Sequence, residues 1–157
     1  MSTRANIIVI ESNGDYSKQT QFYRHCDGYL SETGKNLAIV SELALTYCPK
    51  EGVKQDGGNY TFRRNFRQVR DKFFQLLKTF DSYEQEADDT DIHGDIEYLY
   101  RVLIERVGDD VVIKVTYVEI PVDTAFDKIL ESKDKLLSGN GYEVKLNVNS
   151  IPQTVNS

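Results

Sequence analysis

The densest group of reactive side chains in the sequence is Phe22-Tyr23-Arg24-His25-Cys26-Asp27-Gly28-Tyr29. It combines aromatic rings with a guanidinium, an imidazole, a thiol and a carboxylate. His25 and Asp27 could act as a general base and its orienting carboxylate. Residues i and i+2 of an extended strand share a face, so this geometry is available. Tyr23 or Tyr29 would then position a substrate.

The same stretch has two other interpretations. One is a binding site for a small ligand or nucleotide, without catalysis, made by Tyr23, Arg24, His25, Asp27 and Tyr29. The other is a structural clasp, in which Arg24 and His25 hydrogen-bond across the turn and Asp27-Gly28 forms an Asx-type turn. Because an isolated His-x-Asp is a weak catalytic signal, we favour the clasp. We assign no catalytic residue and do not expect an enzyme.

A second candidate site is a set of arginines at the start of a predicted amphipathic helix. Arg63, Arg64, Arg67 and Arg70 surround its apolar stripe and could bind phosphate groups or another anion. Alternatively, these arginines pair with the acidic segment that follows. That segment, Asp81 to Glu97, holds no Lys or Arg before Gly94 and is expected to be an exposed loop. It could instead mimic a nucleic-acid backbone toward a host protein.

The composition limits the cofactors and partners. The 157 residues carry a formal net charge of −6, so direct nucleic-acid binding is not expected. Cys26 and Cys48 lack the spacing of a metal site with His25 or His93, and no Gly-rich phosphate loop follows a strand. We therefore expect no metal and no cofactor. No apolar run approaches the roughly 20 residues of a membrane span, and no signal peptide is evident.

Two hairpins and three helices must position these residues. The first hairpin is predicted to pair strands 5–11 and 18–25 through a turn at Asn13-Gly14. The second should pair strands 96–107 and 111–120 through a turn at 108–110. Three helices are predicted. The first covers 34–47 with Ser31 or Thr33 as its cap, and the second covers 62–80. The third runs from a cap at Asp123 or Thr124 to Leu137. Residues 50–60 should form a loop, and 142–148 an edge strand.

This element order predicts an α+β fold, with an antiparallel sheet of two hairpins and about three helices packed mainly on one face. Residues 1–148 would form a single α+β domain and residues 149–157 a loose C-terminal tail.

The two ends of the first hairpin resemble a group of small, uncharacterised phage and prophage proteins. That group opens with STRA, a strand and YRHxDGYP, which Ser2-Thr3-Arg4-Ala5 and Tyr23-Arg24-His25-Cys26-Asp27-Gly28-Tyr29 match. Residues 92–100 match a later block more loosely. Leu30 stands where proline is usual, so the turn geometry that this proline would fix cannot be carried over. The resemblance implies a viral or prophage accessory protein in the cytoplasm of the host cell, and no catalytic assignment.

Together these observations favour a phage-encoded accessory protein that binds a host component, such as an inhibitor of a bacterial defence system. Its expected partner is a host protein, with no membrane involved. The alternative is a small-ligand or nucleotide-binding domain, with or without enzymatic activity, that uses the Tyr23–Tyr29 stretch. The sequence is compatible with a monomer or a homo-oligomer.

Overall fold

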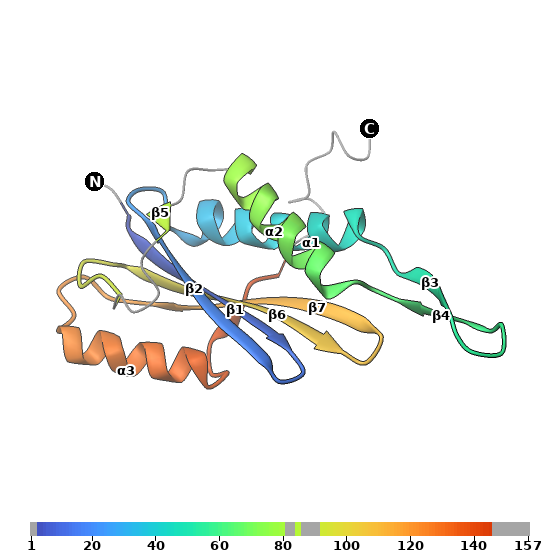
Figure 1. The fold of residues 1–157 in the computed structure, drawn as a ribbon. Coiled ribbons are helices and arrows are strands. Elements are labelled where there is room, and N and C mark those ends of the chain that lie inside the picture. Colours follow the sequence, from blue (N-terminus) through green and yellow to red (C-terminus); the bar gives the residue numbers. More distant parts are fainter. Residues whose placement is uncertain (1–2, 81–83, 86–91, 146–157) are drawn as a thin grey trace.

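The computed structural model describes residues 3–80, 84–85 and 92–145. Within these residues the chain forms an α+β fold with one main sheet (Figure 1). Its strands are β1 (Ala5–Asn13), β2 (Tyr16–Arg24), β5 (Glu84–Gln85), β6 (Tyr98–Val107), β7 (Asp110–Glu119) and β8 (Tyr142–Glu143). They lie in the order β5-β2-β1-β6-β7-β8. The helices are α1 (Lys35–Tyr47), α2 (Phe66–Phe80) and α3 (Phe126–Leu137).

Both predicted hairpins are confirmed. β1 and β2 pair antiparallel, with Ile7 opposite Phe22, and the chain reverses at Gly14, whose φ is +61°. β6 and β7 pair antiparallel, with Tyr100 opposite Tyr117, around Gly108 at φ +61°. Glycine adopts this left-handed conformation without the steric cost that a side chain would add.

The prediction of a purely antiparallel sheet is wrong, because the two hairpins join through a parallel pair. β1 lies parallel to β6, from Ala5 opposite Tyr98 to Ser12 opposite Glu105. A parallel neighbour requires a long crossover, and the chain between β2 and β6 supplies one. The parallel pairing brings both hairpin turns to the same end of the sheet.

Helices cover both faces of the sheet. α1 and α2 lie on one face, where Leu37, Phe73 and Leu77 pack against strand residues such as Val102. α3 lies on the other face, where Ile129 and Leu136 are buried among residues of the opposite strand face. Because the central strand β1 is covered on both sides, its run Ile7-Ile8-Val9 is apolar without alternation. No helix in the described ranges is both long and apolar enough to cross a membrane.

The predicted loop at 50–60 is instead a two-stranded hairpin, which we call the arm. It consists of β3 (Glu51–Lys54) and β4 (Tyr60–Arg63), paired antiparallel, and it extends away from the main sheet (Figure 1). All residues of both strands are exposed, and the aromatic residues Tyr60 and Phe62, which alternate with polar residues in β4, bury no face. As a consequence α2 begins at Phe66 and not at Phe62. At this observed start, Asn65 Oδ1 accepts a hydrogen bond from the Gln68 backbone N–H.

α1 begins within one residue of the predicted start, but the side-chain caps predicted for α1 and α3 are wrong. A π-helical turn over Leu30–Gly34 precedes α1, and the Thr33 hydroxyl donates to the Asp27 carbonyl, away from the helix amides. α3 begins after Ala125, without a side-chain cap. The C-terminal tail 149–157, the end of the predicted strand 142–148 and most of the acidic segment 81–97 lie outside the described residues.

Candidate functional site

The structure separates the two predicted groups of site residues to opposite ends of the sheet. β2 begins at Tyr16, beside the hairpin turns, and ends at Arg24, so the Tyr23–Tyr29 stretch lies at the far end. Arg63 and Arg64 lie at the near end, because they pair with Asp109 and Asp110 at the β6–β7 turn. The two groups therefore do not form one site.

The backbone of the Tyr23–Tyr29 stretch is held by several hydrogen bonds. The buried Arg24 donates from Nε to the Cys26 carbonyl at 2.6 Å, and its Nη2 lies 3.8 Å from the Asp27 carboxylate. The Tyr100 hydroxyl donates to the Gly28 carbonyl at 2.8 Å. A Cβ on Gly28 would lie 2.8 Å from the Ala5 side chain, so only glycine fits there. These contacts tie the stretch to the sheet.

The remaining side chains of the stretch do not converge. His25 and Asp27 are exposed, and His25 Nδ1 lies 3.4 Å from the Tyr23 hydroxyl. The Tyr23 ring stacks on His93, with 3.8 Å between ring centroids. The pKa of the exposed Tyr29 phenol is raised, by desolvation first and by the nearby Asp27 carboxylate second. The raised pKa keeps this phenol protonated at neutral pH.

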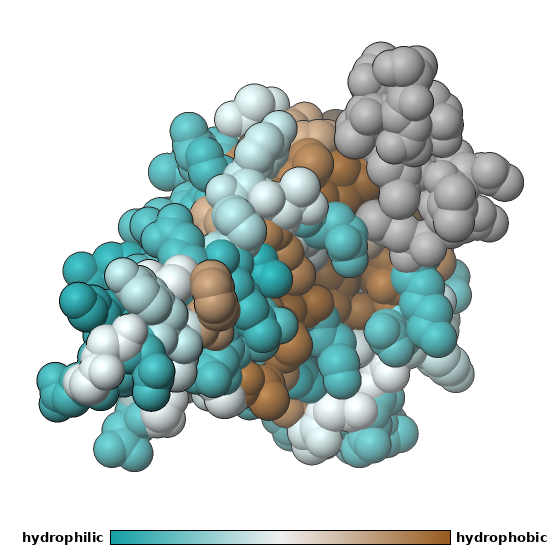
Figure 2. Space-filling model, turned by 90° about the vertical axis from the view of Figure 1, so that its right-hand side faces the viewer, coloured by the Kyte–Doolittle hydropathy of each residue, from teal (hydrophilic) through white to brown (hydrophobic). Residues whose placement is uncertain are grey.

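A hollow of about 650 Å³ lies at the near end of the sheet. It is bounded by the tip of the β1–β2 hairpin, the base of the arm, the start of α2 and the end of β6. Its cationic lining consists of Arg63, Arg64, Arg67, Arg70 and Arg106, and we call it the arginine hollow. Figure 2 views the molecule from this side, where hydrophilic side chains gather beside an apolar band. The hollow thus unites all four arginines predicted from the sequence with a fifth, Arg106.

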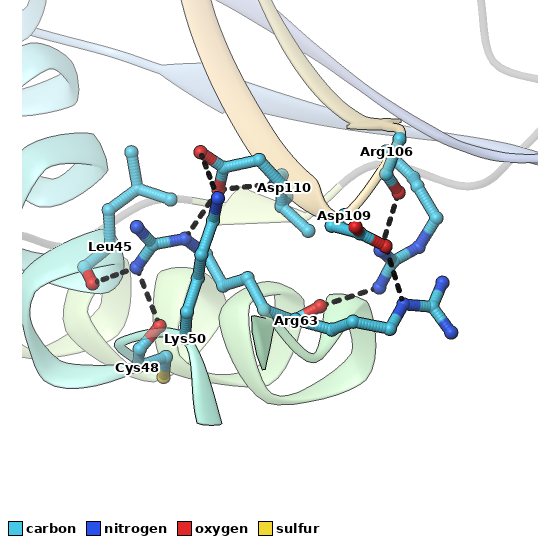
Figure 3. A network of polar contacts seen from close by, with 10 residues as sticks. Leu45, Cys48, Lys50, Arg63, Arg106, Asp109 and Asp110 are labelled. Carbon is cyan, nitrogen blue, oxygen red and sulfur yellow. Dashed lines mark hydrogen bonds and ion pairs between the residues drawn. The ribbon is translucent and has the colours of Figure 1, made fainter. Parts of the chain in front are cut away.

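Arg64 lines the hollow and has a structural role there. Figure 3 shows its partners Leu45, Cys48 and Asp110. The Arg64 side chain is 18% exposed, and its Nε lies 2.7 Å from Asp110 Oδ1. Its Nη1 donates to the carbonyls of Leu45 and Cys48, both at 2.7 Å. The hydrogen bond from Arg64 is the first cause that lowers the Asp110 pKa, followed by the Val111 backbone N–H. Arg64 therefore joins the base of the arm to the end of α1 and the start of β7.

Arg63 and Arg106 use some of their guanidinium nitrogens in contacts within the protein. Arg63 is half-exposed, and its Nε lies 3.3 Å from Asp109 Oδ1. Arg106 donates from Nη2 to the Arg64 carbonyl at 2.6 Å and from Nη1 to the Gly108 carbonyl at 3.2 Å. In Figure 3 the far nitrogens of the Arg63 guanidinium point away from this network. Arg63 can therefore offer donors to a ligand while its orientation is held by Asp109.

Arg70 forms part of the floor of the hollow together with a buried carboxylate. Glu11, at the end of the apolar run of β1, is 2% exposed. Its Oε1 lies 3.5 Å from Arg70 Nη1 and accepts a hydrogen bond from the Tyr16 hydroxyl at 3.3 Å. Arg70 also contacts Asp71, whose hydrogen bond is the main cause that raises the Arg70 pKa. Both partners of Glu11 among the described residues, Arg70 and Tyr16, thus line the hollow.

Arg67 differs from the other four arginines. It is exposed, and within the described part of the chain its guanidinium has neither a hydrogen-bond nor an ion-pair partner. It lies in the first turn of α2, which contains no acidic residue. The N-terminus of a helix carries partial positive charge and unpaired N–H groups, which favour anions. Glu51 is the one carboxylate among the lining residues, whereas five of them are arginines.

Three of these residues, Arg106, Tyr16 and Glu11, were not predicted from the sequence. Arg106 lies far along the chain in β6, and Tyr16 follows the first hairpin turn, so only the fold brings them to Arg67. Glu11 does carry a signal, because a carboxylate ends an otherwise apolar strand on its buried face. Among the described residues, no group of three or more His, Cys, Asp or Glu side chains is placed to hold a metal ion.

Comparisons of the chain with protein-family models, curated proteins and solved structures found no match.

Proposed function

We propose that this protein acts by binding, and that the arginine hollow receives an anionic, phosphate-bearing group of its partner. One observation carries the proposal: Arg67 lies in a hollow lined by four further arginines and has no partner of its own among the described residues. An unpaired guanidinium can donate two parallel hydrogen bonds to a phosphate or carboxylate.

The roles of the other arginines support this assignment. Arg64 and Arg70 are committed to carboxylates and carbonyls, so they shape the hollow. Arg63 and Arg67 offer guanidinium nitrogens that such contacts leave available. The volume of about 650 Å³ falls within the range of roughly 300–1,000 Å³ that small-molecule sites occupy.

The biological role we propose is that of a phage-encoded accessory protein that binds a host component and blocks or sequesters it, for example to inhibit a bacterial defence system. The support comes from the resemblance of the Ser2–Ala5 and Tyr23–Tyr29 segments to phage proteins. An acidic or phosphorylated host protein and a free phosphate-bearing ligand would bind the same arginines. The Tyr23–Tyr29 stretch is a weaker location, because Arg24 and Gly28 already serve the fold.

The test is calorimetric titration with inorganic triphosphate, the simplest probe of the shared chemistry. We expect binding that weakens at least tenfold in Arg67→Ala and weakens with added salt. Lys78→Ala is the matched control: Lys78 is an exposed cation in the last turn of the same helix, about 16 Å along its axis at 1.5 Å per residue. Absence of binding, or an equal loss in both variants, would overturn the proposal.

A further inference from the structure

We infer that the ligand of the arginine hollow is a nucleotide, whose base stacks on Tyr16 while its phosphates contact Arg67 and Arg63. This inference rests on the proposed anion-binding function and names the class of ligand. It starts from a feature that phosphate binding alone does not explain, which is an aromatic ring presented beside the arginines.

Tyr16 is presented to the hollow with its ring accessible and its position fixed. The residue is 43% exposed, lines the hollow and lies at the tip of the first hairpin. Its hydroxyl donates to Glu11 Oε1 at 3.3 Å, which anchors the far edge of the ring. Aromatic side chains held in this way are the usual platforms on which nucleobases stack.

The anchor itself argues for a built site. A carboxylate buried to the extent of Glu11 is costly unless it is paired. Its partners among the described residues are the Tyr16 hydroxyl and Arg70 Nη1, and both side chains line the hollow. The buried carboxylate therefore positions one aromatic ring and one guanidinium side by side. A flat base can stack on both kinds of group.

The rest of the lining matches the other parts of a nucleotide. Val53 of the arm is 45% exposed and lines the same hollow, so it and Tyr16 supply accessible apolar surface. Arg67 and Arg63 supply donors of the planar, bidentate kind that suits phosphate oxygens. An inorganic phosphate would leave the apolar part of the hollow without a contact. A ligand with a flat ring and a phosphate chain uses both parts.

The test compares ATP, inorganic triphosphate and adenosine as probes in calorimetric titrations of the full chain. We expect ATP to bind at least tenfold more tightly than triphosphate, and adenosine to bind weakly. Tyr16→Leu, which keeps apolar bulk but removes the flat ring, should abolish the advantage of ATP over triphosphate. Tyr16→Phe, which retains the flat ring, should keep most of the advantage of ATP. Tyr142→Ala is the control, since Tyr142 is 71% exposed on the distant edge strand β8.

The outcomes separate this inference from the proposed function. If triphosphate binds and ATP binds no better, the anion-binding function stands and the nucleotide inference falls. That comparison uses the wild-type chain, so it does not depend on how the variants fold. If ATP binds better but Tyr16→Leu keeps the full advantage, the base lies elsewhere and the inference is again overturned. If neither probe binds, both proposals fall together.

Discussion

The division of the arginines into structural and ligand-binding groups makes a sharp prediction for Arg64 and Arg67. Arg64→Ala removes the donors to the carbonyls of Leu45 and Cys48 and to the Asp110 carboxylate. Hydrogen bonds to charged groups contribute about 1.5–3 kcal/mol each. The three are not additive, and the half-exposed Asp110 is solvated in the variant, so its ion pair contributes little.

The expected loss for Arg64→Ala is therefore about 3 kcal/mol. Most of it comes from the Cys48 carbonyl, which is left without a donor, and from the Leu45 carbonyl, which keeps only the Cys48 backbone N–H at 3.3 Å. At roughly 2–4 °C per kcal/mol for a chain of this size, the melting temperature should fall by about 6–12 °C. Arg67→Ala removes no hydrogen bond or ion pair among the described residues, and the side chain is exposed, so the stability of the variant should stay within about 0.5 kcal/mol of wild type.

Thermal and urea denaturation followed by circular dichroism, with both variants beside the wild type, measures these losses. A loss below about 1 kcal/mol for Arg64→Ala would show that the network in Figure 3 does not hold the arm to the body. A comparable loss for Arg67→Ala would mean that Arg67 has a structural contact, and it would remove the observation on which the proposed function depends.

Four further predictions follow from the structure. Phe73→Ala should cost about 3–5 kcal/mol in urea denaturation, because Phe73 is fully buried; a loss under about 1 kcal/mol would contradict its place in the core. The pKa of Asp110 is lower in the folded chain than its unfolded value of 3.8, so the ionised carboxylate stabilises the fold above that pH. This stabilisation is lost as pH falls through the folded pKa, and the difference in melting temperature between wild type and Asp110→Asn should therefore shrink from pH 7 to pH 3. Arg70→Met should lower the free energy of unfolding by about 3 kcal/mol, because it leaves the buried Glu11 carboxylate with the Tyr16 hydroxyl as its remaining partner among the described residues. Adding Glu11→Leu should restore most of this stability, and a coupling energy near zero in the double-mutant cycle would show that the two residues do not interact. His25→Ala should change stability by less than about 1 kcal/mol, because the imidazole is exposed; a larger fall in melting temperature would give His25 a structural role.

Local signals account for what the sequence predicted well. Asn13-Gly14 and Gly108-Asp109 marked both hairpin turns, because a tight turn needs residues that tolerate positive φ. The stripe of Phe66, Val69, Phe73 and Leu77 has the period of a helix, and all four are buried in α2. These features depend on neighbours a few residues apart, so one sequence is enough to reveal them.

The parts that could not be predicted depend on distant contacts. Nothing local in β1 says whether β6 joins it parallel or antiparallel, although its unbroken apolar run indicates a strand covered on both faces. The arm was predicted as a loop because its exposed strands bury no alternating face. The pairing of Glu11 with Arg70 crosses from strand to helix, so the floor of the candidate site became visible only with the fold.

The parallel pairing of β1 with β6 has a consequence during synthesis of the chain. β1 is complete at residue 13, whereas β6 is complete only at residue 107. At roughly 5–20 residues per second, a ribosome needs about 5–20 s to make the intervening segment. During that interval the β1–β2 hairpin can close, but the other edge of β1 keeps its backbone N–H and C=O groups without their β6 partners. A nascent chain that stalls before residue 98 would therefore expose an apolar strand edge that chaperones recognise and other nascent chains can join.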